Sequence, residues 1–179
     1  MTAQIANGGF AVKPKIIVDS NPISYEDAKQ SMESGLLFDT DSQELLDKKL
    51  FKNQKNIKIV QEAMFASTNE RFGTSYKSRI DDPKYQFAGK TGTAQVKRIS
   101  KRERELDLEL EQIPYKDRDH ALYVAYGPYV NPRYAISIIV EHGGSGSKAA
   151  APIAKKLFKL IIDRHDLRNK QSNFERITV

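Results

Sequence analysis

The stretch QFAGKTGTAQV, residues 86–96, decides how this chain is interpreted. Its composition suits a strand that leaves a turn. On a strand, successive side chains point to opposite faces, so Lys90 and Gly92 share one face while Thr91 and Thr93 share the other. A cation, two hydroxyls and a position without a side chain therefore stand side by side. This grouping favours the binding of an anionic ligand.

Each of these residues has a definite chemical use. Lys90 can supply positive charge to a nucleophile or a carboxylate, and Gly92 removes the side chain that would block a ligand lying against the strand. A hydroxyl at Thr91 or Thr93 can hold a carboxylate. If the strand lies at a sheet edge, its free backbone groups can pair with an extended peptide, and one N–H can face a developing oxyanion. A plain strand with a solvated Lys90 is the alternative that the triplet by itself leaves open.

Hydrophobic periodicity places this stretch in an α+β fold, an antiparallel sheet covered by helices. Strands are expected at residues 87–96, 121–126 and 134–141. A closing helix is expected at residues 149–164, with its apolar side lying across the sheet. The residues of that apolar side are Ile153, Leu157, Leu160 and Ile161.

The first half of the chain has weaker signals. A helix over residues 1–7 is expected to end at Gly8 and Gly9, and Ser147 is expected to cap the closing helix. Four further segments are expected: extended chain at 10–18, a loop at 19–37, a short polar helix at 42–51 and an amphipathic helix at 57–66.

Composition sets limits on the class of protein. With 179 residues and 39% hydrophobic content, the chain can bury one core. It holds no cysteine, so disulfides give no clue to its compartment, and it shows no apolar run of membrane length. The net charge of +6 raises nucleic acid as a partner. The basic segment 97–104 is followed at once by acidic residues without interleaved aromatics, so we expect no nucleic-acid binding.

Several segments together carry a family resemblance. The triplet Lys90-Thr91-Gly92 is the third signature of serine β-lactamases and penicillin-binding proteins. In the same order as in that family, the chain resembles the C-terminal part of the transpeptidase domain of penicillin-binding protein 2, a class B, elongation-type peptidoglycan D,D-transpeptidase. The resembling segments are residues 1–12, 87–96, 120–132 and 134–152.

The resemblance implies a partial transpeptidase fold and a role for each residue of the motif. Lys90 would support the hydroxyl chemistry and, with Thr91, Gly92 and Thr93, bind the substrate or β-lactam. The N–H of Thr93 would belong to the oxyanion hole. The implied partners are peptidoglycan stem peptides, β-lactams and proteins of the elongation complex, on the periplasmic side of the inner membrane; no cofactor or metal is implied.

The family's other two motifs, Ser-x-x-Lys and Ser-x-Asn, are missing from their expected places before Lys90. Ser67-Thr68-Asn69 fits one pattern but reads as a helix exit, and Ser145 to Lys148 fits the other but follows the third motif. We therefore expect residues 1–179 to be the C-terminal portion of a transpeptidase domain, inactive by itself. A charged insertion is expected at about 97–116 and a tail at about 167–179. The alternative is a non-catalytic module that binds cell-wall peptide or a protein.

Two further expectations concern surfaces. The strand at 134–141 would lack a covering neighbour, so the isolated chain is expected to self-associate through that edge, which carries Ile136, Ile138 and Val140. No metal site is expected, because the three histidines lack ligand spacing. His120 and His142 are expected to be solvated or capping, and His165 to end the last helix.

Overall fold

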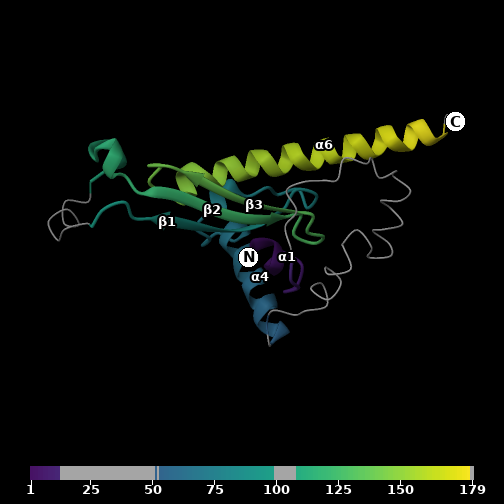
Figure 1. Ribbon diagram of the computed structural model, residues 1–179, viewed down its shortest axis with the longest axis horizontal. Helices are drawn as coiled ribbons and strands as arrows, with labels where there is room; N and C mark the ends of the chain where they lie inside the picture. Colours follow the sequence, from purple (N-terminus) through teal and green to yellow (C-terminus); the bar gives the residue numbers. More distant parts are fainter. Residues whose placement is uncertain (13–50, 52, 99–107, 178–179) are drawn as a thin grey trace. The chain divides into compact units, whose positions relative to one another are not determined.

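A computed structural model describes residues 1–12, 51, 53–98 and 108–177 (Figure 1). The chain divides into two compact units, one of Met1 with Ala3–Val60 and one of Thr2 with Gln61–Val179. The loop expected at 19–37 and nearly all of the short helix expected at 42–51 lie outside the described residues.

The N-terminal helix ends where the glycines predicted. α1 (Thr2–Ala6) has Asn7 as its C-cap, and Gly8 and Gly9 follow with φ of 84° and 95°. Such positive φ values favour glycine. The Asn7 side-chain oxygen accepts hydrogen bonds from the N–H groups of Gly9 and Phe10, at 3.1 and 3.0 Å. A Cβ on Gly9 would stand 2.1 Å from Cδ1 of Ile57, so a larger residue there would also force the Ile57 side chain to move.

The second helix is longer than its apolar pattern indicated. α4 (Gln54–Asn69) begins after Asn53, whose side-chain oxygen accepts the N–H of Lys55 at 3.0 Å. Ile57 and Met64 are buried, as helical spacing predicted, whereas Val60 is 41% exposed. The helix runs from the first unit into the second.

The sheet is a three-stranded antiparallel meander in the order β1-β2-β3. Its strands are β1 (Ala88–Ala94), β2 (His120–Gly127) and β3 (Tyr134–Val140). Gly92 pairs with Leu122, and Leu122 pairs with Ile139. The expected strands and the α+β class are confirmed. Among the described strands, β1 and β3 form the two edges.

The closing helix covers one face of the sheet (Figure 1). A π-helical turn, η4 (Gly146–Ala150), leads into α6 (Ala151–Ile177). The core between sheet and helix combines aromatic rings with alanines, and the ring of Phe158 stacks on Phe87 with centroids 4.9 Å apart. The buried residues are Phe87, Ala121, Tyr123, Ala125, Ala150, Ala151, Ala154, Phe158 and Ile162.

Three predictions about this helix were wrong. Its buried face holds Ala151, Ala154, Phe158 and Ile162, whereas Ile153, Leu157 and Leu160 are 39%, 37% and 61% exposed. Alanines let the helix backbone come close to the sheet, which larger side chains would prevent. The helix also continues to Ile177, so the expected tail is helical in its described part. Ser145, not Ser147, precedes the first turn, and no side-chain hydrogen bond caps it.

The segment expected as a charged insertion contains two short turns where it is described. They are the 3-10 turns η2 (Leu110–Gln112) and η3 (Tyr115–Asp117). Residues 99–107, which include most of the basic stretch, lie outside the described residues.

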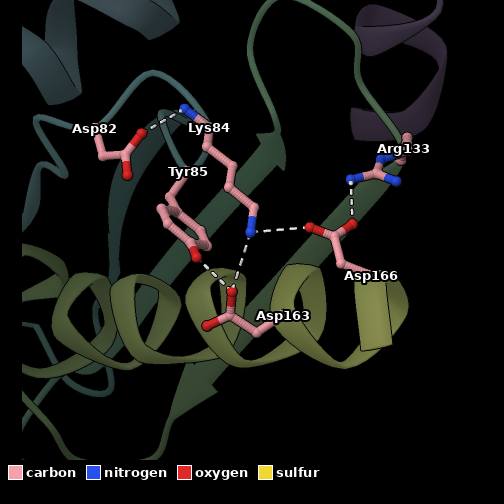
Figure 2. A network of polar contacts seen from close by, with 6 residues as sticks. All are labelled: Asp82, Lys84, Tyr85, Arg133, Asp163 and Asp166. Carbon is pink, nitrogen blue, oxygen red and sulfur yellow. Dashed lines mark hydrogen bonds and ion pairs between the residues drawn. The ribbon is translucent and has the colours of Figure 1, made fainter. Parts of the chain in front are cut away.

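A polar network fastens α6 to the chain before β1 (Figure 2). The Lys84 ammonium lies 3.3 Å from the carboxylate of Asp163 and 2.9 Å from that of Asp166. The Tyr85 hydroxyl donates to Asp163, and Arg133, from the β2–β3 connection, lies 3.8 Å from Asp166. One helix face thus gathers cations from two other segments.

Candidate active site

The signature residues lie on β1 with the alternation that the sequence predicted. Thr91 is paired with Tyr123, and Thr93 with Ala121, on the face that α6 covers. Lys90 is paired with Val124 on the opposite face, as is Gly92 with Leu122. Lys90 and Thr93 are exposed, and Thr91 and Gly92 are half-buried.

The backbone of Thr91 faces the free edge of β1. The Lys90 ammonium donates to the Thr91 carbonyl oxygen at 2.9 Å, and this contact is exposed. In an antiparallel strand, backbone groups alternate between the two sides, so residues two apart face the same way. The N–H of Thr93 is therefore directed to the same open edge as the Thr91 carbonyl.

The backbone of Gly92 faces the neighbouring strand instead. A Cβ added at Gly146, in η4, would lie 2.4 Å from the Leu122 carbonyl oxygen and 2.7 and 3.1 Å from the oxygen and nitrogen of Gly92. Gly146 thus packs directly over the point where β1 and β2 meet. No side chain fits there. The backbone at the start of the closing helix therefore fixes the position of β1 in the direction perpendicular to the sheet.

A row of hydroxyls supports Thr91 from the side of α4. The Thr91 hydroxyl lies 3.1 Å from the Thr74 hydroxyl, which lies 3.2 Å from the Ser67 hydroxyl. Each hydroxyl can donate one hydrogen bond and accept others, so the row fixes the rotamer of Thr91. The end of α4 thereby orients a side chain of the signature motif.

A second hydroxyl cluster is buried beneath the first. The Tyr123 hydroxyl lies 2.9 Å from Thr68 Oγ1 and 3.1 Å from Ser75 Oγ, and these two lie 3.3 Å apart. Burial raises the pKa of Tyr123, against the opposing effect of these two hydrogen bonds. A Cβ on Gly89 would stand 2.2 Å from the Tyr123 hydroxyl, so Gly89 makes room for the cluster.

Both short serine patterns have structural roles. Ser67 and Thr68 belong to the hydroxyl contacts, and Asn69 ends α4 and donates to the Phe87 carbonyl at 3.0 Å. The interpretation of this triplet as a helix exit is confirmed. Ser145 lies at the start of η4, with its hydroxyl 2.9 Å from that of Ser147.

The histidines agree with the prediction only in part. The His142 N–H donates to His120 Nδ1 at 2.9 Å, and His142 Nδ1 lies 2.9 Å from the Arg118 carbonyl oxygen. Both rings are half-buried and contact backbone groups, which agrees with the capping role that was one of the two expected for them. His165 lies within α6 rather than at its end. Over the described ranges, no cluster of three or more metal-ligating side chains occurs.

Sequence reasoning missed Thr74, Ser75 and Tyr123 as supports of the motif. Their spacing from Thr91 carries no local pattern, because the contacts join the end of α4, a loop and two strands. The polar run 73–75 before the strand is typical of a turn, and it gives no sign of these contacts.

The family of this chain follows from its match to known sequences. The penicillin-binding protein transpeptidase domain matches residues 1–159. The chain belongs to this family.

Relatives in sequence and structure agree. The peptidoglycan D,D-transpeptidase MrdA of Salmonella typhimurium is 38% identical over 105 residues, 59% of this chain and 16% of the relative. Penicillin-binding protein 2 of Pseudomonas aeruginosa, in complex with WCK 5153, superposes with a TM-score of 0.59 at 28% identity, over 89% of this chain and 28% of that one. Helicobacter pylori penicillin-binding protein 2, in complex with MreC, superposes with a TM-score of 0.51 at 30% identity. The superposition covers 66% of this chain and 21% of that one.

These matches confirm the resemblance to part of the transpeptidase domain of penicillin-binding protein 2, and the α+β class. The chain spans 16% of the length of the Salmonella relative. In the part of the chain that the structure describes, no helix is long and apolar enough to cross a membrane.

Proposed function

We propose that this chain supplies the substrate-binding strand of a peptidoglycan D,D-transpeptidase, with the serine nucleophile provided by another part of the longer protein. The observation that supports this most directly is the open edge of β1, where the Lys90 ammonium and the Thr91 carbonyl meet. The proposed ligands are stem peptides and β-lactams, and the proposed location is the periplasmic side of the inner membrane. Elongation proteins are proposed partners, since one structural relative was solved with MreC.

In this proposal the free edge of β1 binds the peptide and stabilises the reaction. An extended stem peptide pairs with the backbone of Thr91 and Thr93, and the hydroxyls of these two residues hold its carboxylate. When the serine attacks the acyl carbonyl, negative charge develops on its oxygen, and the Thr93 N–H donates to that oxygen. Lys90 adds positive charge beside the attacking hydroxyl, and Gly92 leaves the strand surface open.

The chain by itself is expected to form no acyl-enzyme, because the motifs Ser-x-x-Lys and Ser-x-Asn are missing from their expected places before Lys90. Intact-mass spectrometry of the 179-residue chain after incubation with a β-lactam tests this. A stoichiometric adduct would contradict it.

The roles on β1 are tested in the longer protein by its rate of labelling with fluorescent penicillin. Thr93→Pro removes the N–H while an edge strand tolerates proline, and we expect a loss of about 10²–10³-fold. Thr93→Ala keeps the N–H and is the matched control, with a much smaller loss. Lys90→Gln keeps the length of a polar side chain without the charge and should also slow acylation strongly. Equal labelling of Thr93→Pro and Thr93→Ala would refute the oxyanion role.

The open edge of β1 equally suits a non-catalytic module that binds cell-wall peptide or a protein. The two functions are distinguished by labelling source-cell membranes with fluorescent penicillin and then blotting them with an antibody raised against this chain. A labelled band well above 20.3 kDa supports the enzyme, and an unlabelled band at 20.3 kDa supports the module.

A further inference from the structure

A groove whose charged lining residues all carry the same sign includes Thr74, the residue whose hydroxyl contacts Thr91 of β1. It runs between the segment after α4, which includes η1 (Tyr76–Ser78), and the start of α6, and it has a volume of about 830 Å³. That volume is typical of a ligand site. All of its charged lining residues are cations: Arg71, Lys77, Lys148, Lys155, Lys156 and Lys159.

The absence of carboxylates from this lining departs from the rest of the chain. The sequence has 29 Lys and Arg against 23 Asp and Glu, so six charged residues taken at random would include carboxylates. Within the described ranges, the ion pairs use Arg79, Lys84, Lys97 and Arg133, none of which lines the groove. The groove cations therefore repel one another, and a bound anion would relieve that repulsion.

The cations on the closing helix form a stripe. Lys148, Lys155 and Lys159 follow one another at intervals of seven and four residues, which places them on one helix face. At the rise of a helix, this stripe is roughly 16 Å long. A single small anion cannot contact its whole length, whereas a chain of anionic groups can.

The uncharged lining favours phosphate groups. Thr74 and Ser147 bring hydroxyls to the groove, and phosphate oxygens accept hydrogen bonds from hydroxyls as well as from lysines. Tyr76 is the aromatic residue of the lining, and its ring already carries the Arg79 guanidinium at 4.1 Å from its centroid. The groove therefore offers a base little stacking surface, which single-stranded nucleic acid would use.

We propose that this groove binds an extended polyanion whose phosphate groups follow one another along α6. None of the four signature residues lines this groove, and the proposal does not depend on the proposed acyl transfer. Thr74 lines the groove and also contacts the Thr91 hydroxyl. The bound polyanion would therefore lie next to a residue that supports the signature strand.

The test uses the full 179-residue chain and inorganic polyphosphate, with binding followed by calorimetry at two salt concentrations. The groove variant Lys148→Gln/Lys155→Gln is compared with Lys58→Gln/Lys116→Gln, which removes the same charge from exposed positions outside the groove. We expect the groove variant to bind about tenfold more weakly than the wild type and the control pair within about twofold of it. Higher salt should weaken binding to the wild type. Circular dichroism checks that both variants are folded.

Five results would overturn the proposal. Undetectable binding of polyphosphate to the wild type, or equal weakening in both variant pairs, would leave no role for the groove. Orthophosphate binding as tightly as polyphosphate would mean a single-anion site. Poly-glutamate binding as tightly would remove the preference for phosphate, and tighter binding of a single-stranded oligonucleotide would identify a nucleic-acid surface.

Discussion

At the scale of single residues, two tyrosines of β2 differ sharply in how their hydroxyls are satisfied. Tyr123 shares its hydroxyl with Thr68 and Ser75. The buried hydroxyl of Tyr126, by contrast, has no hydrogen-bond partner among the described residues. Burial raises the pKa of both groups, so both stay protonated at neutral pH.

This difference predicts opposite effects of the same substitution. Tyr123→Phe removes one of the hydrogen-bond partners of Thr68 and of Ser75, two buried side chains, and should lower the free energy of unfolding by about 1–2 kcal/mol. Tyr126→Phe removes a hydroxyl without a hydrogen-bond partner. It should leave the free energy of unfolding unchanged or raise it by up to about 1 kcal/mol. Urea denaturation of the two variants provides the measurement, and each serves as the control for the other. Equal destabilisation would contradict the hydrogen-bond assignment.

Gly146 gives the second prediction at this scale. In Gly146→Ala, the new methyl group would collide with backbone atoms of Gly92 and Leu122, which cannot rotate away. We expect a loss of about 1–3 kcal/mol in the free energy of unfolding.

Ser147→Ala is the control for Gly146→Ala, because it removes one hydrogen bond in the same turn without adding an atom. Thermal denaturation compares the two. If Gly146→Ala were as stable as the control, the close contact between η4 and β1 would be disproved.

At the scale of elements, the network between α6 and the segment before β1 makes stability depend on pH. The Tyr85 hydroxyl and Lys84 hold the pKa of Asp163 below its ordinary value of 3.8, and Lys84 does the same for Asp166. The carboxylates also raise the pKa of Lys84, Asp166 most of all. The contribution of the carboxylates is present above pH 3.8 and is lost as the pH falls through their lower folded values.

The double variant Asp163→Asn/Asp166→Asn should therefore be less stable than the wild type at pH 7, with the difference shrinking as the pH falls below 3.8. Urea midpoints between pH 7 and pH 2 give the comparison. The exposed Glu111, changed to Gln, is the control and should show little difference. A pH-independent difference would mean that the carboxylates act through packing instead of charge.

The elements also show how much of the fold could be predicted from the sequence. The faces of β1 were predictable, because side chains alternate strictly along a strand. The buried face of α6 was not predictable from the apolar residues alone. Ile153, Leu157 and Leu160 form a regular stripe, yet Ala151 and Ala154 contact the sheet. The distance between helix and sheet decides how large a side chain can lie between them.

The candidate site was predictable as a motif but not as a supported structure. Lys90, Thr91, Gly92 and Thr93 stand out in sequence, whereas the hydroxyls of Ser67 and Thr74 reach Thr91 through tertiary contacts. Polar residues in loops give no local signal of such contacts. The strands expected at 121–126 and 134–141 allow His120 and His142 to approach each other, but the hydrogen bond from the His142 N–H to His120 Nδ1 depends on the β2–β3 register, which the sequence does not give.

At the scale of the whole molecule, β3 is expected to promote self-association. It forms an edge of the described sheet, and Ile139 is 63% exposed on it. Ile136, Ile138 and Val140, by contrast, point toward α6 and are partly buried. The edge thus offers free backbone groups together with one large apolar side chain to a second copy.

We expect the isolated chain to dimerise at high concentration, and Ile139→Lys to raise the dissociation constant by about tenfold or more. Val130→Lys is the control, because Val130 is 85% exposed in the β2–β3 connection and lies outside the strand. Sedimentation equilibrium distinguishes the states. A wild-type chain that stays monomeric at high concentration would exclude association through this edge.

The backbone contact of Gly146 with Gly92 and Leu122 bears on how the signature strand could be inhibited. A compound bound between η4 and the sheet would push β1 away from the closing helix. Thr91 and Thr93 would then be displaced together, because they belong to the same strand. Under the proposed function, such a compound would act on β1 without competing with a bound peptide and without carrying a reactive acyl group.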